Sequence, residues 1–316
     1  MGILVVGSVA LDSVKTPFGT REEVLGGAAT YFSIAASYFT DVSMIAVVGE
    51  DFPEKHVASL QKKGINLSGL ERRQGKTFRW KGEYAPDFSS RTTLDTQLNV
   101  FADFTPKLTA AHFSSEYIFL ANIDPDLQRS VLEQVRQPRL VACDTMNYWI
   151  SNKRGSLLKT LARVDLLVIN DEEARQLAGQ MNLIQAARWI LTLGPKMLVV
   201  KRGEYGAMVF GPRSVFCVPA YPVEDVVDPT GAGDTFAGGL MGYLAGTGAM
   251  GDSALRKAVV YGSAMASFNV TGFGPEKIGD LTFTEIEARY QGFRKLVSFE
   301  DAPEAGTEVA DLKYLL

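Results

Sequence analysis

The segment DPTGAGD, residues 228–234, lies between an apolar pair, residues 226–227, and a stretch of helical pattern over 232–245. Gly231 and Gly233 carry no side chain, so a ligand can come close to the backbone there. The first amides of a helix have no partner within the helix. A turn of this kind at a helix start therefore predicts a site for an anion such as phosphate.

Asp234 falls in the first turn of the same expected helix, beside the anion site. An acidic residue there has a simpler explanation, because it stabilises a helix start by about 0.3–1 kcal/mol. Capping alone, however, does not need the Gly-Ala-Gly sequence before it. Phosphoryl transfer needs positioning, charge stabilisation and a base for the attacking hydroxyl. We therefore predict that Asp234 is the general base of a phosphoryl transfer from ATP to a hydroxyl.

The rest of the chain alternates between short apolar runs and helical patterns. The apolar runs, each of strand length, are residues 4–6, 43–48, 117–120, 140–143, 166–169 and 197–200. The helical patterns are residues 26–39, 53–63, 125–135, 155–162, 182–192, 252–268 and 282–290. This alternation is typical of an α/β fold with a mostly parallel sheet covered by helices on both faces.

Two polar segments, residues 12–24 and 72–104, interrupt this pattern. The second contains the alternating run TFRWKGEY, residues 77–84, which indicates strands with one face in water. We predict that the two segments form a small sheet beside the main domain; a pair of exposed loops is the alternative. The expected α/β domain then comprises residues 1–11, 25–71 and 105–300. Residues 301–316 form a C-terminal tail without an assignment.

Composition excludes several classes of function. The chain has 316 residues and a formal net charge of −4, with no run rich in Lys or Arg, so no nucleic-acid partner is expected. The apolar run at the N-terminus is too short to span a membrane and follows no basic segment, which predicts a soluble cytoplasmic protein. Cys143 and Cys217 lie in apolar runs and are predicted to be reduced core thiols. His56 and His112 have no metal-ligand spacing.

The segment at 228–234 resembles the C-terminal signature of the ribokinase (PfkB) family of carbohydrate and nucleoside kinases. Three further motifs resemble that family in order and spacing. They are the di-glycine at 26–27, the Asn-x-x-Glu motif at 170–173 and the Gly-x-x-Gly turn at 203–206. The resemblance covers about residues 3 to 290. It implies a doubly wound, ribokinase-like α/β domain with a small β lid over the substrate site.

The resemblance also implies roles for residues around the phosphates. Asp234 is then the base, and the amides of Gly231, Ala232 and Gly233 hold the phosphoryl group. Asn170 and Glu173 organise Mg²⁺ through water; a helix cap with first-turn acids is the alternative. The positions expected to bind the ATP cofactor are Asn170, Glu173, Lys201, Gly203, Gly206, Thr230, Ser263, Thr271 and Gly274. A monovalent cation, K⁺, is a further expected cofactor near 271–274.

On the substrate side, Asp12 stands where the family places an aspartate that accepts hydrogen bonds from substrate hydroxyls; a turn residue is the alternative. The other expected substrate residues are Gly26, Gly27, Tyr31, Arg79 and Asn147. Ala10 stands where ribose enzymes have asparagine, and residues 28–31 lack their lysine and asparagine. Lost polar partners cost orders of magnitude in discrimination, so ribose is not expected.

The predicted function is ATP-dependent phosphorylation of a hydroxyl on a small sugar or polyol. A nucleoside kinase and a non-catalytic nucleotide-binding relative are the alternatives. Aromatic residues in the lid segment suit a nucleoside, because bases stack on aromatic faces. The presence of Asp234 favours an active enzyme, since a protein without catalysis has no need of it. The chain is expected to be a monomer or a homodimer paired through the lid.

Overall fold

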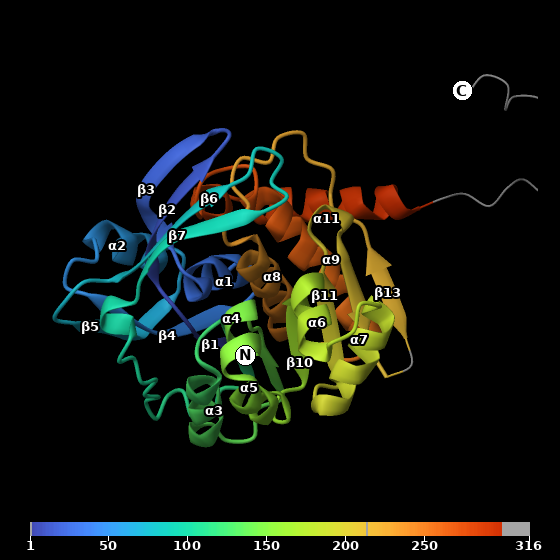
Figure 1. Cartoon of the computed structure of the whole chain (residues 1–316), viewed down its shortest axis with the longest axis horizontal. Coiled ribbons are helices and arrows are strands. Elements are labelled where there is room, and N and C mark those ends of the chain that lie inside the picture. The colour runs from blue at the N-terminus through green and yellow to red at the C-terminus, as the bar shows by residue number, and fades with distance from the viewer. Residues whose placement is uncertain (1, 213, 299–316) are drawn as a thin grey trace, which may run out of the picture.

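A computed structural model describes residues 2–212 and 214–298 of the chain. It contains a nine-stranded sheet with the order β13-β12-β11-β10-β9-β8-β1-β4-β5 and a four-stranded sheet with the order β3-β2-β6-β7. The small sheet stands above the end of the large one that carries β1, β4 and β5 (Figure 1). The end of the expected domain, residues 299–300, and the expected C-terminal tail, residues 301–316, lie outside the described residues.

The large sheet is parallel except at one edge. Its parallel strands are β1 (Gly2–Val6), β4 (Asp41–Gly49), β5 (Asn66–Arg73), β8 (Tyr117–Leu120), β9 (Leu140–Cys143), β10 (Leu166–Asn170) and β11 (Met197–Lys201). The antiparallel strands β12 (Ala207–Phe210) and β13 (Val215–Val218) complete it. Cys143 is buried as predicted, but Cys217 is exposed, because β13 is an edge strand.

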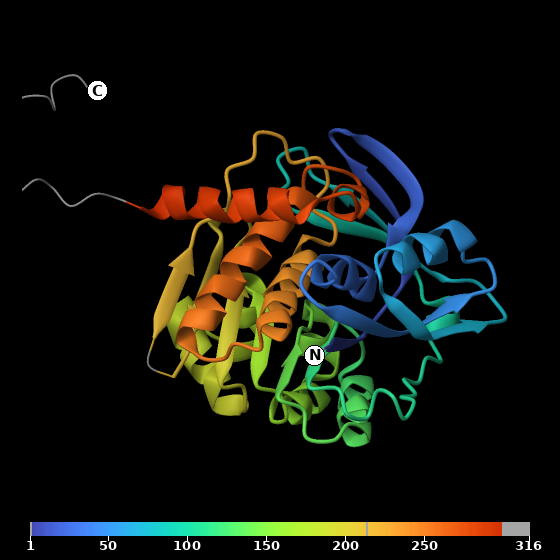
Figure 2. The ribbon, with the colours of Figure 1, turned by 180° about the vertical axis from the view of Figure 1, so that it is seen from behind.

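Helices cover both faces of this sheet, which confirms the predicted fold class. Figure 1 shows α3 (Pro125–Gln134), α4 (Asn147–Asn152), α5 (Arg154–Leu161), α6 (Asp171–Ala178) and α7 (Leu183–Ile190) in front. Figure 2 shows the other face with α1 (Ala28–Ala36), α2 (Glu54–Lys62), α8 (Ala232–Thr247), α9 (Asp252–Asn269), α10 (Glu276–Gly279) and α11 (Phe283–Val297). Short 3-10 turns are η1 (Asn99–Phe101), η2 (Leu191–Leu193) and η3 (Gly203–Tyr205).

The central strands bury side chains on both faces. In β1, Ile3 and Val5 belong to the core under α1 and α8, whereas Leu4 and Val6 belong to the core on the opposite face. Side chains alternate between the faces of a strand, so a strand covered on both sides is apolar throughout. This explains why the central parallel strands have continuous apolar sequences rather than alternating ones.

Helices α1 and α8 pack very close together, because glycines of α8 lie against the backbone of α1 and of the residues that follow it. A Cβ atom on Gly238 would lie 2.3 Å from the carbonyl oxygen of Phe32, and one on Gly246 would lie 2.2 Å from that of Phe39. Only glycine allows the backbones to approach this closely. The amino ends of both helices therefore lie side by side.

The small sheet consists of β2 (Ala10–Thr16), β3 (Gly19–Gly26), β6 (Phe78–Tyr84) and β7 (Arg91–Gln97). Its strands come from the two polar segments of the sequence, with β2 and β6 parallel and the other pairs antiparallel. The first register pair of β2 and β3 joins Ala10 to Gly26, so these strands extend about two residues beyond the expected segment at each end. Within the described ranges, no helix is both long and apolar enough to cross a membrane.

Candidate active site

Polar residues gather at the carboxyl ends of the parallel strands. Asn170 ends β10, Lys201 ends β11, and Asp144 directly follows β9. The start of α8 reaches the same edge, because a Cβ atom on Gly233 would lie 2.7 Å from Nζ of Lys201. Ligands of open α/β sheets bind at this edge of the strands. The geometry therefore places the predicted phosphate turn where the fold class binds its ligands.

The turn at 228–234 has the backbone of an anion site. Gly231 is the N-cap of α8 with φ of 74°, and within the described chain no side chain caps the helix start. The amide of Thr235 donates to the carbonyl of Gly231 at 2.8 Å, and that of Ala232 donates to Pro229 at 3.2 Å. The amides at 233–234 belong to the first turn, where a helix offers no acceptor. The amide of Asp234 contacts its own carboxyl, and that of Gly233 has no backbone acceptor outside the helix among the described residues. The helix dipole favours a negative charge at this end.

Asp234 lies half-buried at this helix start, close to two basic side chains. Burial raises the pKa of its carboxyl to about 6, while the charges of Lys201 and Arg91 act in the opposite direction. A general base is most effective when its pKa lies near the working pH. Asp234 therefore has both the position and the acidity that a base for an attacking hydroxyl requires.

Asp12 is a second buried carboxylate of the site. Its side chain is 5% exposed, and a Cβ atom on Gly26 would lie only 2.0 Å from its Oδ2 atom. Burial raises the pKa of Asp12 to about 7, although a hydrogen bond from the amide of Gly27 lowers it. Repulsion from Asp228 and Asp234 adds to the increase, which shows that the three acids share one region.

Asn170 and Glu173 form a reciprocal helix cap. The Asn170 amide donates to Oε2 of Glu173 at 2.8 Å, and the Glu173 amide donates to Oδ1 of Asn170 at 2.7 Å. The capping alternative is thus present in the structure. The cap also holds the buried Glu173 in place; burial raises the pKa of this acid, and Lys201 opposes the increase.

Asp144 and Thr145 are site residues that the sequence analysis missed. Both are 5% exposed, and within the described part of the chain Oδ1 of Asp144 and Oγ1 of Thr145 have no hydrogen-bond partner. Burial raises the pKa of Asp144; repulsion from Asp234 and Glu173 adds to this, and Lys201 opposes it. Unpaired buried oxygens are costly unless a ligand satisfies them. The signal in the sequence was an acid directly after a buried strand.

These acids fit a magnesium ion that shares its coordination with phosphate and water. Among residues 2–212 and 214–298, no three His, Cys, Asp or Glu side chains are close enough to hold a metal ion by themselves. Mg²⁺ usually keeps several waters and takes one or two carboxylates together with substrate phosphates. Asp144, with its unpaired oxygen, and Glu173 form such a pair.

The lid contacts the anion turn through Tyr84. Its hydroxyl lies 3.1 Å from Oγ1 of Thr230, directly before the glycines. Arg91 pairs with Tyr84 in the lid ladder, and its guanidinium lies 5.2 Å from the ring of Trp80. The charge of Arg91 also lowers the pKa values of Asp12 and Asp234. Arg91 is therefore a lid cation close to the acids, and the sequence analysis missed it.

The lid arginine that the sequence analysis chose, Arg79, has other partners. It forms ion pairs with Glu23 at 2.9 Å and with Asp51 at 2.8 Å, and it donates to the carbonyl of Thr77. Among the described residues it makes no hydrogen bond or ion pair with Asp12 or Asp234. Its donors join the lid to the main domain, and its expected contact with substrate stays a prediction.

Other predicted residues lie around this centre. Tyr31 is 1% exposed beneath the anion turn, and its hydroxyl has no hydrogen-bond partner within the described chain. Asn147 donates to Oε1 of Gln176 at 2.9 Å, a contact between α4 and α6. Gly27 caps α1 with φ of 94°. Asn147 is thus engaged by a neighbouring helix, and no substrate contact is assigned to it.

The expected nucleotide positions divide between two places. Gly203 and Gly206 flank the 3-10 turn η3, and Ser263 is buried in α9. Thr271 donates to the carbonyl of Phe268 at 2.8 Å. Gly274 lies on the lid side, because a Cβ atom there would be 3.5 Å from Cγ2 of Val24 in β3. The role expected for Gly274 on the adenine side stays a prediction.

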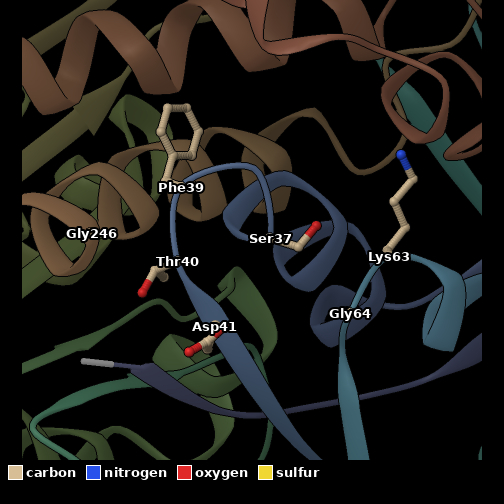
Figure 3. Close-up of a pocket in the computed structure, with 7 residues that line it drawn as sticks. All are labelled: Ser37, Phe39, Thr40, Asp41, Lys63, Gly64 and Gly246. Atoms are coloured by element: carbon tan, nitrogen blue, oxygen red, sulfur yellow. The ribbon is translucent and has the colours of Figure 1, made fainter.

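A separate open hollow of about 460 Å³ lies away from these residues (Figure 3). Asp41, which begins β4, is part of its lining, together with Ser37, Phe39, Thr40, Lys63, Gly64 and Gly246. It therefore lies at the amino ends of the parallel strands, opposite the edge where the acids gather. In open α/β sheets, ligands bind at the carboxyl ends of the strands, which is the other edge.

The turn at 228–234, the carboxyl of Asp234 beside it and the small sheet near the carboxyl ends of the parallel strands suit phosphoryl transfer. The fold itself is ribokinase-like. The crystal structure of Methanocaldococcus jannaschii nucleoside kinase has a TM-score of 0.75 with this chain at 20% identity; the match covers 92% of this chain and 98% of that one. A putative ribokinase II from Escherichia coli, in complex with ATP and Mg²⁺, has a TM-score of 0.76 at 20% identity, with 92% and 99% covered.

The sequence itself matches the family model of the pfkB family carbohydrate kinases over residues 3–278. The chain belongs to this family, and it is a phosphotransferase, as the sequence predicted. It is 29% identical to the cytidine kinase of Thermococcus kodakarensis over 252 residues, which is 78% of this chain and 90% of that protein.

Proposed function

We propose that this enzyme transfers the γ-phosphoryl group of Mg·ATP to a hydroxyl on the sugar of a nucleoside. The observation that carries the reaction type is the pairing of the open anion turn with Asp234, whose pKa of about 6 suits a base. The similarity to a cytidine kinase over most of the chain supports a nucleoside acceptor over a free sugar or polyol. Free sugars, the first expectation from the sequence, become the alternative.

The residues divide the work as follows. Asp12 accepts hydrogen bonds from sugar hydroxyls, since an ionised carboxylate is an acceptor only. Asp234 takes the proton of the attacking hydroxyl. The oxygen of that hydroxyl forms a bond to the γ-phosphorus, while the bond between the γ-phosphorus and the β–γ bridging oxygen breaks. ADP is the leaving group. The amides of Gly233 and Asp234, with Lys201 beside them, stabilise the charge that spreads over the phosphoryl oxygens.

Mg²⁺, when bound, would neutralise phosphate charge, with Asp144 and Glu173 holding it through water. The lid supplies the remaining parts. Trp80 and Tyr84 offer aromatic surface for a base, and Arg91 adds positive charge opposite the acids. A lid closed over the acceptor excludes water and so limits hydrolysis of ATP.

The test is ATP consumption with Mg²⁺ against a panel of nucleosides and free sugars, including cytidine, inosine, ribose and fructose. We expect turnover on at least one nucleoside at more than about tenfold the best free sugar, because a base stacked in the lid adds binding that a sugar lacks. The Asp234→Asn variant is the control for contaminating kinases. A free sugar as the best acceptor would overturn the nucleoside proposal. ATP binding without any turnover would favour the non-catalytic alternative.

Two further expectations stay predictions. One is a cytoplasmic location. The other is the assembly state: all seven residues of β7 are exposed at the edge of the lid sheet, an arrangement that suits pairing between two lids. Light scattering of the purified chain distinguishes a monomer from a homodimer, and substitution of a β7 residue by proline should abolish a dimer formed through this edge.

A further inference from the structure

The side chain of Asn269 lies beneath the anion turn and contacts both of its ends. It is fully buried at the end of α9. Its Nδ2 atom donates to the carbonyl of Thr230 at 2.8 Å, and its Oδ1 atom accepts from the hydroxyl of Thr235 at 3.1 Å. A carbonyl can only accept, so the amide orientation is fixed by its partners. The glycines and Asp234 lie between these two anchor points.

Backbone hydrogen bonds join the same two segments. The carbonyl of Val270 accepts from the amides of Val227 at 2.7 Å and Asp228 at 3.2 Å. Asp228, which is 1% exposed, accepts from the amide of Gly274 at Oδ2 and from that of Thr230 at Oδ1. Residues 227–230 and 269–274 are thus joined by several hydrogen bonds. Among the described residues of these segments, Asn269 is the one whose side chain reaches both sides of the turn.

We propose that Asn269 is a positioning residue that holds the anion turn in shape by its hydrogen bonds to Thr230 and Thr235. This rests on the proposed role of the turn in phosphoryl transfer but not on the choice of acceptor. Removing the amide leaves the Thr230 carbonyl buried without a partner and lets the turn move. A displacement of about 1 Å at a reacting centre lowers the rate by about 10²-fold.

The experiment compares Asn269→Ala and Thr235→Val with Thr160→Val. Thr160 is a matched control, because its buried hydroxyl donates to the carbonyl of Pro125, remote from the site. Hydrogen exchange is measured on the ligand-free proteins over residues 228–236, and turnover is measured with Mg·ATP and cytidine. We expect faster exchange in that segment for Asn269→Ala and, to a smaller extent, for Thr235→Val, with no local change in Thr160→Val.

In the same Asn269→Ala variant, kcat should fall about 10- to 100-fold while the KM for ATP changes less than about threefold. Unchanged exchange over 228–236 in Asn269→Ala, or a kcat equal to that of the wild type, overturns the proposal. Failure of the nucleoside proposal is distinguishable, because it abolishes turnover of the wild type on cytidine and leaves the exchange result intact. If Asn269→Ala does not fold, Thr235→Val decides, because unchanged exchange over 228–236 in that variant also overturns the proposal.

Discussion

Gly231 lies directly against the aromatic ring of Tyr31. A Cβ atom at 231 would be 2.5 Å from Cδ1, Cδ2 and Cε1 of that ring, and Gly231 has φ of 74°. The tyrosine ring, buried at the start of α1, thus forms the floor under the anion turn at the start of α8. Both space and backbone conformation require glycine at this position.

We therefore expect Gly231→Ala to lose at least about 10²-fold in kcat and about 1–3 kcal/mol of stability, since the turn must move off the ring. Steady-state kinetics and chemical denaturation measure both effects. Gly155→Ala is the matched control: this α5 residue has open space around its Cβ direction, so alanine should stabilise it by about 0.5–1 kcal/mol. Wild-type activity in Gly231→Ala would show that the turn does not bind the phosphoryl group.

Asp234→Asn should bind Mg·ATP like the wild type but lose about 10²–10⁴-fold in kcat, the usual contribution of a general base. Only the ionised acid can take a proton, so kcat of the wild type should fall as the pH drops below the Asp234 pKa of about 6. A pH–rate profile of kcat tests this. A flat profile between pH 5 and 8 (roughly the range in which such a base titrates) would assign the base to another group.

The raised pKa of Asp234 also predicts a stability effect. A carboxyl whose pKa rises from 3.8 in the unfolded chain to about 6 in the folded one stabilises the fold only while protonated, so that contribution is lost as the pH rises through 6. Asparagine does not titrate. The Asp234→Asn variant should therefore be more stable than the wild type at pH 8, by on the order of 2 kcal/mol, and nearly equal at pH 4. Thermal unfolding at both pH values measures the difference, and a variant less stable at pH 8 contradicts it.

The two lid arginines should behave differently. Arg91→Ala removes positive charge near Asp12 and Asp234, so we expect kcat/KM to fall about 10- to 10²-fold with little change in stability. Arg79→Ala breaks the ion pairs with Glu23 and Asp51, so its main effect should be on the lid. Kinetics and limited proteolysis of the two variants separate these roles. A larger kinetic loss in Arg79→Ala would support the substrate contact first expected for that residue.

The parts of the site that sequence analysis predicted are contiguous in the chain. The anion turn with Asp234 and the Asn170–Glu173 cap each fit within a few residues, so local chemistry reveals them. Six of the nine strands of the large sheet were equally visible, because burial on both faces makes them continuously apolar. The strands β5, β12 and β13, at or near the edges of the sheet, were not predicted. The lid sheet was predicted from the two polar segments, residues 12–24 and 72–104, and from the alternation of apolar and polar residues within the second.

The residues that sequence analysis missed depend on contacts between distant segments. Arg79 and Arg91 both lie on lid strands, and only the fold decides which one faces the acids and which one meets Asp51. Cys217 sits in an apolar run, yet it is exposed because its strand has no neighbour on one side. Asp144 has an unpaired oxygen that appears only when the loops around it are placed. Local patterns do not contain this information.

Asp144 gives a prediction that separates a ligand-binding acid from a structural one. Its unpaired Oδ1 and its closeness to Glu173 and Lys201 suit water-mediated binding of Mg²⁺. Asp144→Asn should raise the Mg²⁺ concentration for half-maximal turnover about 10- to 100-fold, the usual effect of losing a group that supports metal binding. Asp165→Asn is the matched control. Asp165 directly precedes β10, at the amino ends of the parallel strands. Its carboxylate accepts from the amide of Val141 and pairs with Lys196.

The control should lose stability and keep the wild-type Mg²⁺ requirement, because its partners are fixed by the fold and lie far from the phosphates. A titration of Mg²⁺ at constant ATP measures the requirement in all three proteins. If Asp144→Asn lowers kcat without moving the Mg²⁺ midpoint, the acid acts on Asp234 or Lys201 by charge alone. In that case Glu173 and the phosphates hold the Mg²⁺ ion without Asp144.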